Sequence, residues 1–274
     1  MNQLSSVKRT HIVAALVEGC SIRSIVRMTG ASKNTIAKLL VELGATCADC
    51  LDKNLVNLNS KRVQCDEIWS FVGAKDKNIP TARRDEVGIG SVWTWVAIDS
   101  DSKLVCSWLV GKRDPGCATE FIQDLAGRLS NRVQLTTDGL KMYLNAVKDG
   151  FGEDIDYAML VKVYGSDPEG EKRYSPAICT SCKAETKIGN PDAKHINTSD
   201  IERQNLTMRM QMRRFTRLTN AFSEKIENHV AAVALHYMHY NFCRIHQTLR
   251  VTPAMQAGLT NHIWTIQEVI GLLG

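Results

Sequence analysis

Apolar residues in the first 44 positions recur at spacings of three and four, which is the spacing of one face of an α-helix. They fall into three sets, and Gly19 and Gly30 separate one set from the next. Ser21 and Ser32 stand immediately before the second and third sets, where the N-cap residues of helices are expected. The pattern predicts three short helices joined by tight turns over residues 1–44.

The third predicted helix would carry short polar and basic side chains on its outer face, namely Ser32, Lys33, Asn34, Thr35 and Lys38. Side chains of this kind reach phosphates and base edges in a major groove, so they are candidate DNA-binding residues. The three helices would then form a small all-α helix-turn-helix domain. A three-helix module for dimerisation or capping would show the same apolar pattern, and the sequence leaves this alternative open.

Helical spacing is lost over residues 45–60, which predicts a linker, and strand-like alternation begins at residue 61. Three predicted strands are followed by a helix, a strand, a helix and a strand, over residues 62–71, 91–99, 103–111, 118–129, 132–139, 141–151 and 157–165. This order predicts an α/β sheet with helices on its faces. We expect an extended loop over residues 165–198 and helical structure over residues 199–246, with a break near Thr219.

The chain of 274 residues has a net charge of +5, and its basic residues are unevenly spread. Residues 1–44 hold six lysines and arginines against two acidic residues, and residues 202–225 hold the same numbers. Such clusters suit a polyanion such as nucleic acid, although a solvated helix face would give the same count. The sequence has no signal-peptide pattern and no apolar run of bilayer length, so we expect a cytoplasmic protein with no membrane partner.

The nine cysteines are an odd number in a chain large enough to fold without disulfides, which favours free thiols in a reducing compartment. Cys47 with Cys50, and Cys179 with Cys182, each form the C-x-x-C half-site that zinc uses. The two pairs are much farther apart than the roughly 15–20 residues that separate the halves of a compact zinc ribbon. A shared structural zinc and free thiols both stay open.

Three acidic residues lie at positions where a carboxylate is expected to be partly buried or to face a ligand-binding edge of the sheet. Asp66 lies within the first predicted strand, Asp138 at the C-terminal end of the fourth, and Glu202 in the first turn of the helix after the loop. Singly, each has a local explanation, such as an outward strand position, a helix cap or the helix dipole. Together they would repel one another unless divalent cations neutralised them, and oxygen-only ligation suits magnesium or manganese. Glu67 would point to the opposite face of its strand, so only one of Asp66 and Glu67 is expected to share the site.

Two such cations side by side can activate a nucleophile and stabilise the leaving oxygen of a phosphoryl displacement, which points to chemistry on a phosphodiester. Four segments in this order also resemble the insertion sequence one family of bacterial transposases, namely "CDEIWSFVG" around Asp66, "TTDG" at Asp138, "IERQNLTMR" around Glu202 and "YNFCRIHQTLRVTPA" from Tyr240. With the N-terminal helices, the resemblance covers most of the chain. It implies a ribonuclease H-like mixed sheet forming a DDE catalytic domain over residues 61–250, followed by a tail over residues 251–274.

The resemblance also implies a function and a role for each acid. A transposase of this family would bind the terminal inverted repeats of its own element, cut the DNA to expose 3′ hydroxyls and join these to target DNA. Asp66 would bridge two Mg²⁺ or Mn²⁺ ions, with Asp138 and Glu202 each holding one. Double-stranded DNA would be the partner, and we expect a homodimer or larger synaptic complex associated with the bacterial nucleoid.

Basic residues after Glu202 complete the predicted site. Arg209 follows Glu202 by seven positions, as in the family motif, and Arg213 would return to the same helical face, with Arg214 beside it. Guanidinium groups there would hold phosphates beside the cations. His195 is a candidate neighbour of the scissile phosphate. Two other functions stay open: a DNA-binding regulator whose ribonuclease H-like domain is not catalytic, and a ribonuclease H-like nuclease without strand transfer.

Overall fold

The N-terminal segment contains three helices in the order that the apolar pattern predicted. In the computed structural model, which describes residues 4–83, 86, 88–165, 179–216 and 220–274, they are α1 (Ser6–Val17), α2 (Ile22–Thr29) and α3 (Lys33–Asn54). Ser21 and Ser32 cap α2 and α3 as expected, because each side chain accepts a hydrogen bond from the backbone N–H three residues later. Gly30 closes α2 in the left-handed conformation, at φ 66°.

Helix α3 is longer than the sequence pattern predicted. It continues to Asn54, so most of the expected linker over residues 45–60 is helical. Cys47 and Leu51 extend the apolar stripe of Leu40 and Leu43, and all four are buried. Because α3 packs along α7 (Ile226–Met238), distant in sequence, the extension is stabilised by a tertiary contact that local periodicity could not reveal.

The centre of the molecule is a six-stranded sheet in the order β3-β2-β1-β4-β5-β6. Its strands are β1 (Arg62–Val72), β2 (Gly90–Asp99), β3 (Val105–Gly111), β4 (Gln134–Asp138), β5 (Asp156–Tyr164) and β6 (Cys179–Ile188). The first three strands pair antiparallel, whereas β4 runs parallel to β1 and β5 runs parallel to β4. The predicted mixed α/β sheet is confirmed, and its order is consistent with a ribonuclease H-like core.

Strand β6 was not predicted. Residues 165–198 were expected to form an extended loop, yet residues 179–188 pair antiparallel with β5 at the sheet edge. Nearly all side chains of β6 are exposed, so the strand lacks the apolar alternation that sequence reading depends on, and backbone pairing with β5 holds it. Residues 166–178 of the expected loop lie outside the described part of the chain.

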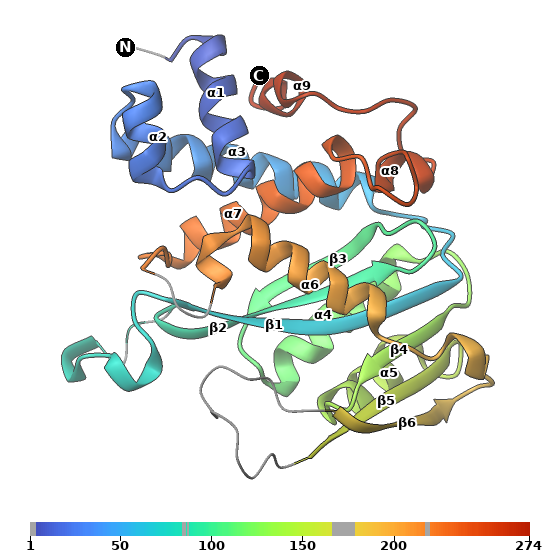
Figure 1. The fold of residues 1–274 in the computed structure, drawn as a ribbon. Helices are drawn as coiled ribbons and strands as arrows, with labels where there is room; N and C mark the ends of the chain where they lie inside the picture. The colour runs from blue at the N-terminus through green and yellow to red at the C-terminus, as the bar shows by residue number, and fades with distance from the viewer. Residues whose placement is uncertain (1–3, 84–85, 87, 166–178, 217–219) are drawn as a thin grey trace.

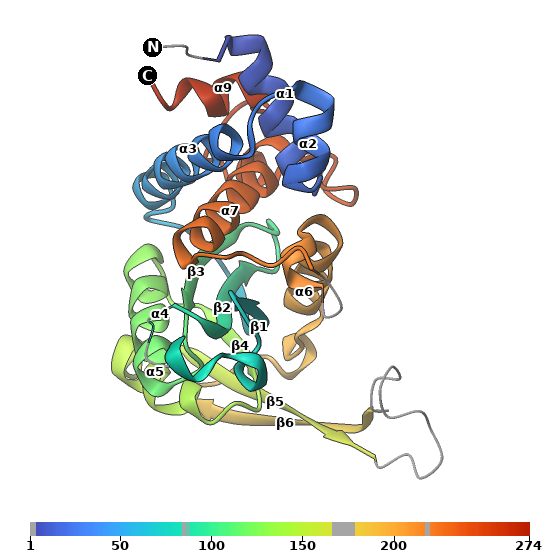
Figure 2. The ribbon, with the colours of Figure 1, turned by 90° about the vertical axis from the view of Figure 1, so that its left-hand side faces the viewer.

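Helices cover both faces of the sheet (Figures 1 and 2). Helices α4 (Pro115–Arg128) and α5 (Met142–Phe151) pack on one face, and α6 (Ser199–Gln211) lies against β1 and β2 on the other. Helix α7 lies between the sheet and the N-terminal helices, and it continues into a wide turn at His239–Cys243. The Asn241 side chain in this turn bonds both backbone polar groups of Val105 at 3.0 Å, which ties the turn to edge strand β3.

The helical region after the loop is broken more widely than expected. Helix α6 ends at Gln211, a single 3₁₀ turn follows at Arg213–Phe215, and α7 begins only at Ile226. The break was predicted near Thr219 and Asn220; Asn220 lies between the two helices, whereas residues 217–219 lie outside the described part of the chain. Arg213 is therefore not on the helix that carries Glu202, and the expected shared helical face of these two residues is wrong.

The predicted tail over residues 251–274 contains two short helices. They are α8 (Pro253–Gln256) and α9 (Ile266–Gly271), and α9 packs on α1 with Val269 almost fully buried. Short 3₁₀ turns at Asp76–Asn78, Thr81–Arg83 and Ala193–His195 complete the elements. Within the described residues, no helix combines the length and the apolar character needed to cross a membrane.

Candidate metal centre

Asp66 and Asp138 lie side by side because β1 and β4 run parallel in register. Cys65 pairs with Thr137, which brings the next residue of each strand, Asp66 and Asp138, to the same level. Asp138 is the last residue of β4, at the carboxyl end of the strand. The two aspartates that were predicted to share a site are therefore brought together.

Glu67 joins this pair, contrary to the expectation from strand alternation. One carboxylate oxygen from each of Asp66, Glu67 and Asp138 lies within 4.8 Å of the other two, and among the described residues this is the one group of three or more potential metal-binding side chains. Neighbours on a strand do point to opposite faces, but β4 ends at Asp138. Among the described residues, no strand of the sheet adjoins β1 on this side past Asp138, and the longer glutamate side chain reaches the aspartates there.

Glu67 already has a cationic partner. Its carboxylate forms an ion pair with Arg113 at 2.6 Å and accepts a hydrogen bond from the Tyr143 hydroxyl at 3.4 Å. The Glu67 side chain is only 2% exposed. Arg113 also lies 4.8 Å from the centre of the Trp93 ring, which fixes its guanidinium in a cation–π contact. Of the three clustered acids, Glu67 is the one held by a side-chain cation.

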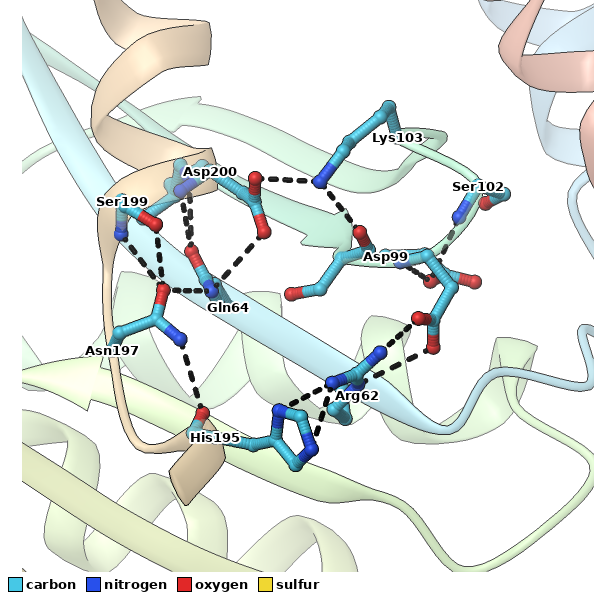
Figure 3. Close-up of polar contacts among 12 residues, drawn as sticks. Arg62, Gln64, Asp99, Ser102, Lys103, His195, Asn197, Ser199 and Asp200 are labelled. Carbon is cyan, nitrogen blue, oxygen red and sulfur yellow. Dashed lines mark hydrogen bonds and ion pairs between the residues drawn. The ribbon is translucent and has the colours of Figure 1, made fainter. Parts of the chain in front are cut away.

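Gln64 holds the start of α6 against the face of β1 from which the Asp66 side chain projects. Gln64 is two residues before Asp66, and its buried side-chain oxygen accepts hydrogen bonds from the backbone N–H groups of Asp200 at 2.9 Å and Ile201 at 3.1 Å (Figure 3). Its amide nitrogen donates to Asn197 at 2.9 Å, and Lys103 pairs with Asp200 at 2.6 Å. N–H groups that a helix leaves unpaired at its start are satisfied by a strand side chain. This cap places the first turn of α6, with Glu202, beside β1.

Glu202 approaches the acid cluster without being part of it. Its carboxylate accepts hydrogen bonds from Lys162 on β5 and from the hydroxyl of Thr198. The Glu202 side chain is 45% exposed. Its charge is nevertheless a minor cause of the raised pKa values of Asp66 and Asp138, so it lies within electrostatic range of both. The three carboxylates expected to converge do so in part: two adjoin, and the third is held nearby by a lysine.

Burial gives the cluster its electrostatic character. Removal of Asp66 from water raises its pKa to about 7, and the neighbouring Glu67 and Asp138 carboxylates contribute to this rise. The pKa values of Glu67 and Asp138 are also raised, again chiefly by burial. Buried carboxylates that destabilise one another's charged forms are the donor set that a hard divalent cation neutralises, so the residues present fit Mg²⁺ or Mn²⁺.

His195 is not placed with the acids. It contacts Arg62 at the beginning of β1, four residues before Asp66, and Arg62 also pairs with Asp101 (Figure 3). The short turn at Ala193–His195 leads into the loop before α6, so His195 helps to position that loop on the sheet. The expectation that His195 neighbours a scissile phosphate is not supported by its position.

The arginines after Glu202 fall into different environments. Arg209 lies in the last turn of α6, and Arg213 is exposed just beyond it. Arg214 instead points inward, where its guanidinium donates to the Ser223 hydroxyl at 2.7 Å and to the Asn228 carbonyl at 2.9 Å. Burial lowers the pKa of Arg214 to about 10. Its guanidinium holds the connection between α6 and α7 together, so the expected phosphate contact is wrong for Arg214.

The two basic regions of the sequence meet at one groove. A groove of about 860 Å³ runs between the N-terminal helices and the connection from α6 to α7. Arg23 and Lys33 line it from one side and Arg213 from the other, and all three are exposed. Of the outer-face residues predicted on α3, Ser32, Lys33, Asn34 and Lys38 are exposed and Thr35 is half-buried.

The two C-x-x-C pairs do not form a shared site. Cys47 is buried in α3 and Cys50 is half-buried, whereas Cys179 and Cys182 are exposed on β6 with their sulfur atoms 3.6 Å apart. Helix α3 and strand β6 lie at opposite ends of the molecule (Figure 2). The proposed zinc joining linker to loop is therefore wrong, and all four thiols are free.

No protein-family model and no curated protein matches the chain. Matching solved structures include the cryo-EM structure of the piggyBac transposase synaptic complex with hairpin DNA, at 10% sequence identity and a TM-score of 0.46, covering 99% of this chain and 71% of that one. The Mos1 transposase paired-end complex with left transposon end matches at 16% identity and a TM-score of 0.23, covering 55% of this chain and 57% of that one. The Mos1 strand transfer complex matches at 16% identity and a TM-score of 0.23, over 54% and 56% of the two chains. This chain spans little more than half the length of the Mos1 chains.

Proposed function

We propose that the protein is a DDE transposase that cuts DNA at the ends of its element and joins those ends to target DNA. The observation that carries this proposal is the pairing of Asp66 and Asp138 on adjacent parallel strands, with Glu202 held beside them by a capped helix. The types of these residues and their order along the chain support the proposal, because they match the motifs that resemble the insertion sequence one family. The order of the strands in the sheet supports it as well, because it suits a ribonuclease H-like core.

In this proposal Asp66, Asp138 and Glu202 would hold two divalent cations, Mg²⁺ or Mn²⁺. When bound, such cations activate an attacking oxygen and stabilise the leaving oxygen of an in-line displacement at phosphorus. Asp66 is the shared residue because it adjoins Asp138 and lies on the face that α6 covers. Glu202 would exchange its bond to Lys162 for the cation site.

DNA would be held mainly by the basic groove and by the N-terminal helices. Arg23 and Lys33 from the first basic region and Arg213 from the second line the same groove. A phosphodiester backbone has the complementary charge. The exposed end of α3 would read the terminal inverted repeats as the recognition helix of a helix-turn-helix. Synapsis of two element ends would require a homodimer or larger assembly.

A single assay tests this function against its two rivals. Purified protein is incubated with Mg²⁺ and duplexes carrying candidate terminal repeats, and both cut strands and joined products are counted. Joined products that disappear in Asp66→Asn and Glu202→Gln variants support a transposase. Cutting without joining would instead identify a nuclease, and binding without cutting would identify a DNA-binding regulator.

A further inference from the structure

Helix α6 carries one side chain that bonds directly to the acid cluster, and it lies three residues after Glu202. Asn205 is 6% exposed, and its amide nitrogen donates a hydrogen bond of 2.9 Å to one carboxylate oxygen of Asp66. Residues three apart lie on neighbouring positions of a helix face, so Glu202 and Asn205 approach the cluster from the same helix. Asn205 lies within the segment "IERQNLTMR", but the sequence alone predicted no role for it.

The Asp66 carboxylate is held at both ends. Its Oδ1 accepts a hydrogen bond of 2.9 Å from the Glu67 backbone N–H, and its Oδ2 accepts the bond from Asn205. Each carboxylate oxygen can accept two such interactions, so one acceptor site remains on each oxygen. A carboxylate fixed in this way, with one acceptor site left on each oxygen, is suited to contact two cations at once.

The other end of the Asn205 amide is unsatisfied. Within the described part of the chain, its buried Oδ1 has no hydrogen-bond partner. A buried amide oxygen without a partner is unfavourable, so packing stability alone does not account for an asparagine here. Nor is Asn205 needed to dock α6, because the Gln64 cap and the Lys103–Asp200 ion pair already fix the start of that helix on the sheet.

From this geometry we propose that Asn205 is a positioning residue, which orients the Asp66 carboxylate for divalent-cation binding. The proposal rests on the proposed function, because it assigns Asn205 to the same cation site. It predicts a loss of cation affinity rather than a loss of fold when the amide is removed. Outer residues that orient a metal-binding carboxylate typically contribute about 10- to 100-fold to metal affinity.

The test is a titration of the purified full-length chain with Mn²⁺. Binding is measured by calorimetry and, independently, by the electron paramagnetic resonance signal of the Mn²⁺ that stays free. Asn205→Ala should weaken Mn²⁺ binding about 10- to 100-fold relative to wild type. Asn205→Leu keeps the side-chain volume and should show the same loss, which provides a second variant if the alanine variant does not fold. In DNA cleavage, excess Mn²⁺ should restore most of the lost rate.

Gln204→Ala is the matched control, because Gln204 is the adjacent buried amide on α6 and, within the described residues, its amide nitrogen has no hydrogen-bond partner. It should bind Mn²⁺ within about twofold of wild type, since an orienting effect needs a contact with the metal-binding carboxylate. Unchanged Mn²⁺ affinity in both Asn205 variants, with Asp66→Asn abolishing binding, would overturn the role of Asn205 and leave the proposed function intact. A wild-type protein that neither binds Mn²⁺ nor cuts DNA would instead remove the proposed function and this inference with it.

Discussion

The aspartates where β1 meets β4 and the glutamate at the start of α6 differ in how the protein compensates their negative charge. At the junction of β1 and β4, Asp66 and Asp138 are buried together, and burial raises both pKa values. At the start of α6, Glu202 is nearly half exposed and is held by Lys162 and Thr198. In the first region Arg113 and Lys162 offset only part of the effect of burial on Asp138, whereas in the second Lys162 pairs directly with Glu202. Assembly of the proposed site therefore requires Glu202 to leave Lys162.

The largest expected effect separates Asp66 from its neighbour Glu67. Asp66→Asn should reduce DNA cleavage on the order of 10³-fold, because it removes the carboxylate that both cations would share in the proposed function. Glu67→Gln should cost only about 10- to 100-fold, because Arg113 and Tyr143 already hold Glu67 and it acts at most beside the cations. Rates of strand cleavage at saturating Mg²⁺ measure both. Equal losses in the two variants would place Glu67 among the cation ligands.

The pH dependence of stability gives the next largest effect. In the cation-free protein Asp66 keeps its proton up to about pH 7, whereas in the unfolded chain it ionises near the ordinary aspartate pKa of 3.8. The native state then binds more protons, so the free energy of unfolding should fall as pH rises from about 4 to about 7, by up to about 4 kcal/mol. Urea unfolding at several pH values without divalent cations measures this slope.

The control for this prediction is Asp66→Asn, which should largely flatten the slope between about pH 4 and about pH 7. Added Mn²⁺ should stabilise the wild-type protein more at about pH 8 than at about pH 5, because a bound cation requires the ionised carboxylate. A wild-type slope that persists unchanged in Asp66→Asn would assign the titration to other groups.

The arginine pair at the groove should divide into a DNA-binding effect and a stability effect. Arg213→Ala should lower the log-log slope of DNA affinity against salt concentration by about 0.9, because one phosphate contact is lost. Arg214→Ala should leave that slope unchanged and lower the free energy of unfolding by about 1–3 kcal/mol, because it removes two partly buried hydrogen bonds. Filter binding at several salt concentrations and urea unfolding measure the two effects. Equal slope changes would return Arg214 to the DNA-binding surface.

The smallest expected effect concerns Lys162 itself. Lys162→Gln removes the cation that holds Glu202 in the absence of metal, so Mn²⁺ should bind up to about fivefold more tightly, as expected for a partly exposed ion pair of at most ~1 kcal/mol. The titration used for Asn205 measures this change. Weaker Mn²⁺ binding in Lys162→Gln would show that Lys162 supports Glu202 in place rather than competing for it.

The sequence predicted the elements whose stability is local or whose core face is regular. Periodicity predicted the order of the first five strands along the chain and the N-caps at Ser21 and Ser32. Motif spacing and strand ends predicted that Asp66 and Asp138 share a site. The division into domains and the DNA-binding role of the N-terminal helices stay predictions.

Other features depended on contacts between distant segments and could not be predicted. Helix α3 extends to Asn54 because it packs on α7, and β6 exists because β5 pairs with it. The end of β4 at Asp138 was predicted, but strand alternation did not show that the Glu67 side chain lies close enough to Asp66 and Asp138 to share their cluster. Asn205 had no signal of its own, since a buried asparagine three residues after a glutamate acquires meaning only when Asp66 is found beside it.

The most direct measurement of the proposed site is anomalous diffraction from crystals of the protein grown with Mn²⁺. Because Asp66 adjoins Asp138 and Glu202 lies within electrostatic range of both, we expect Mn²⁺ between the two aspartates and a Glu202 carboxylate that has left Lys162 to reach it. Absence of Mn²⁺ from the aspartates, at a concentration that supports DNA cleavage by the same preparation, would show that these residues are not the metal centre.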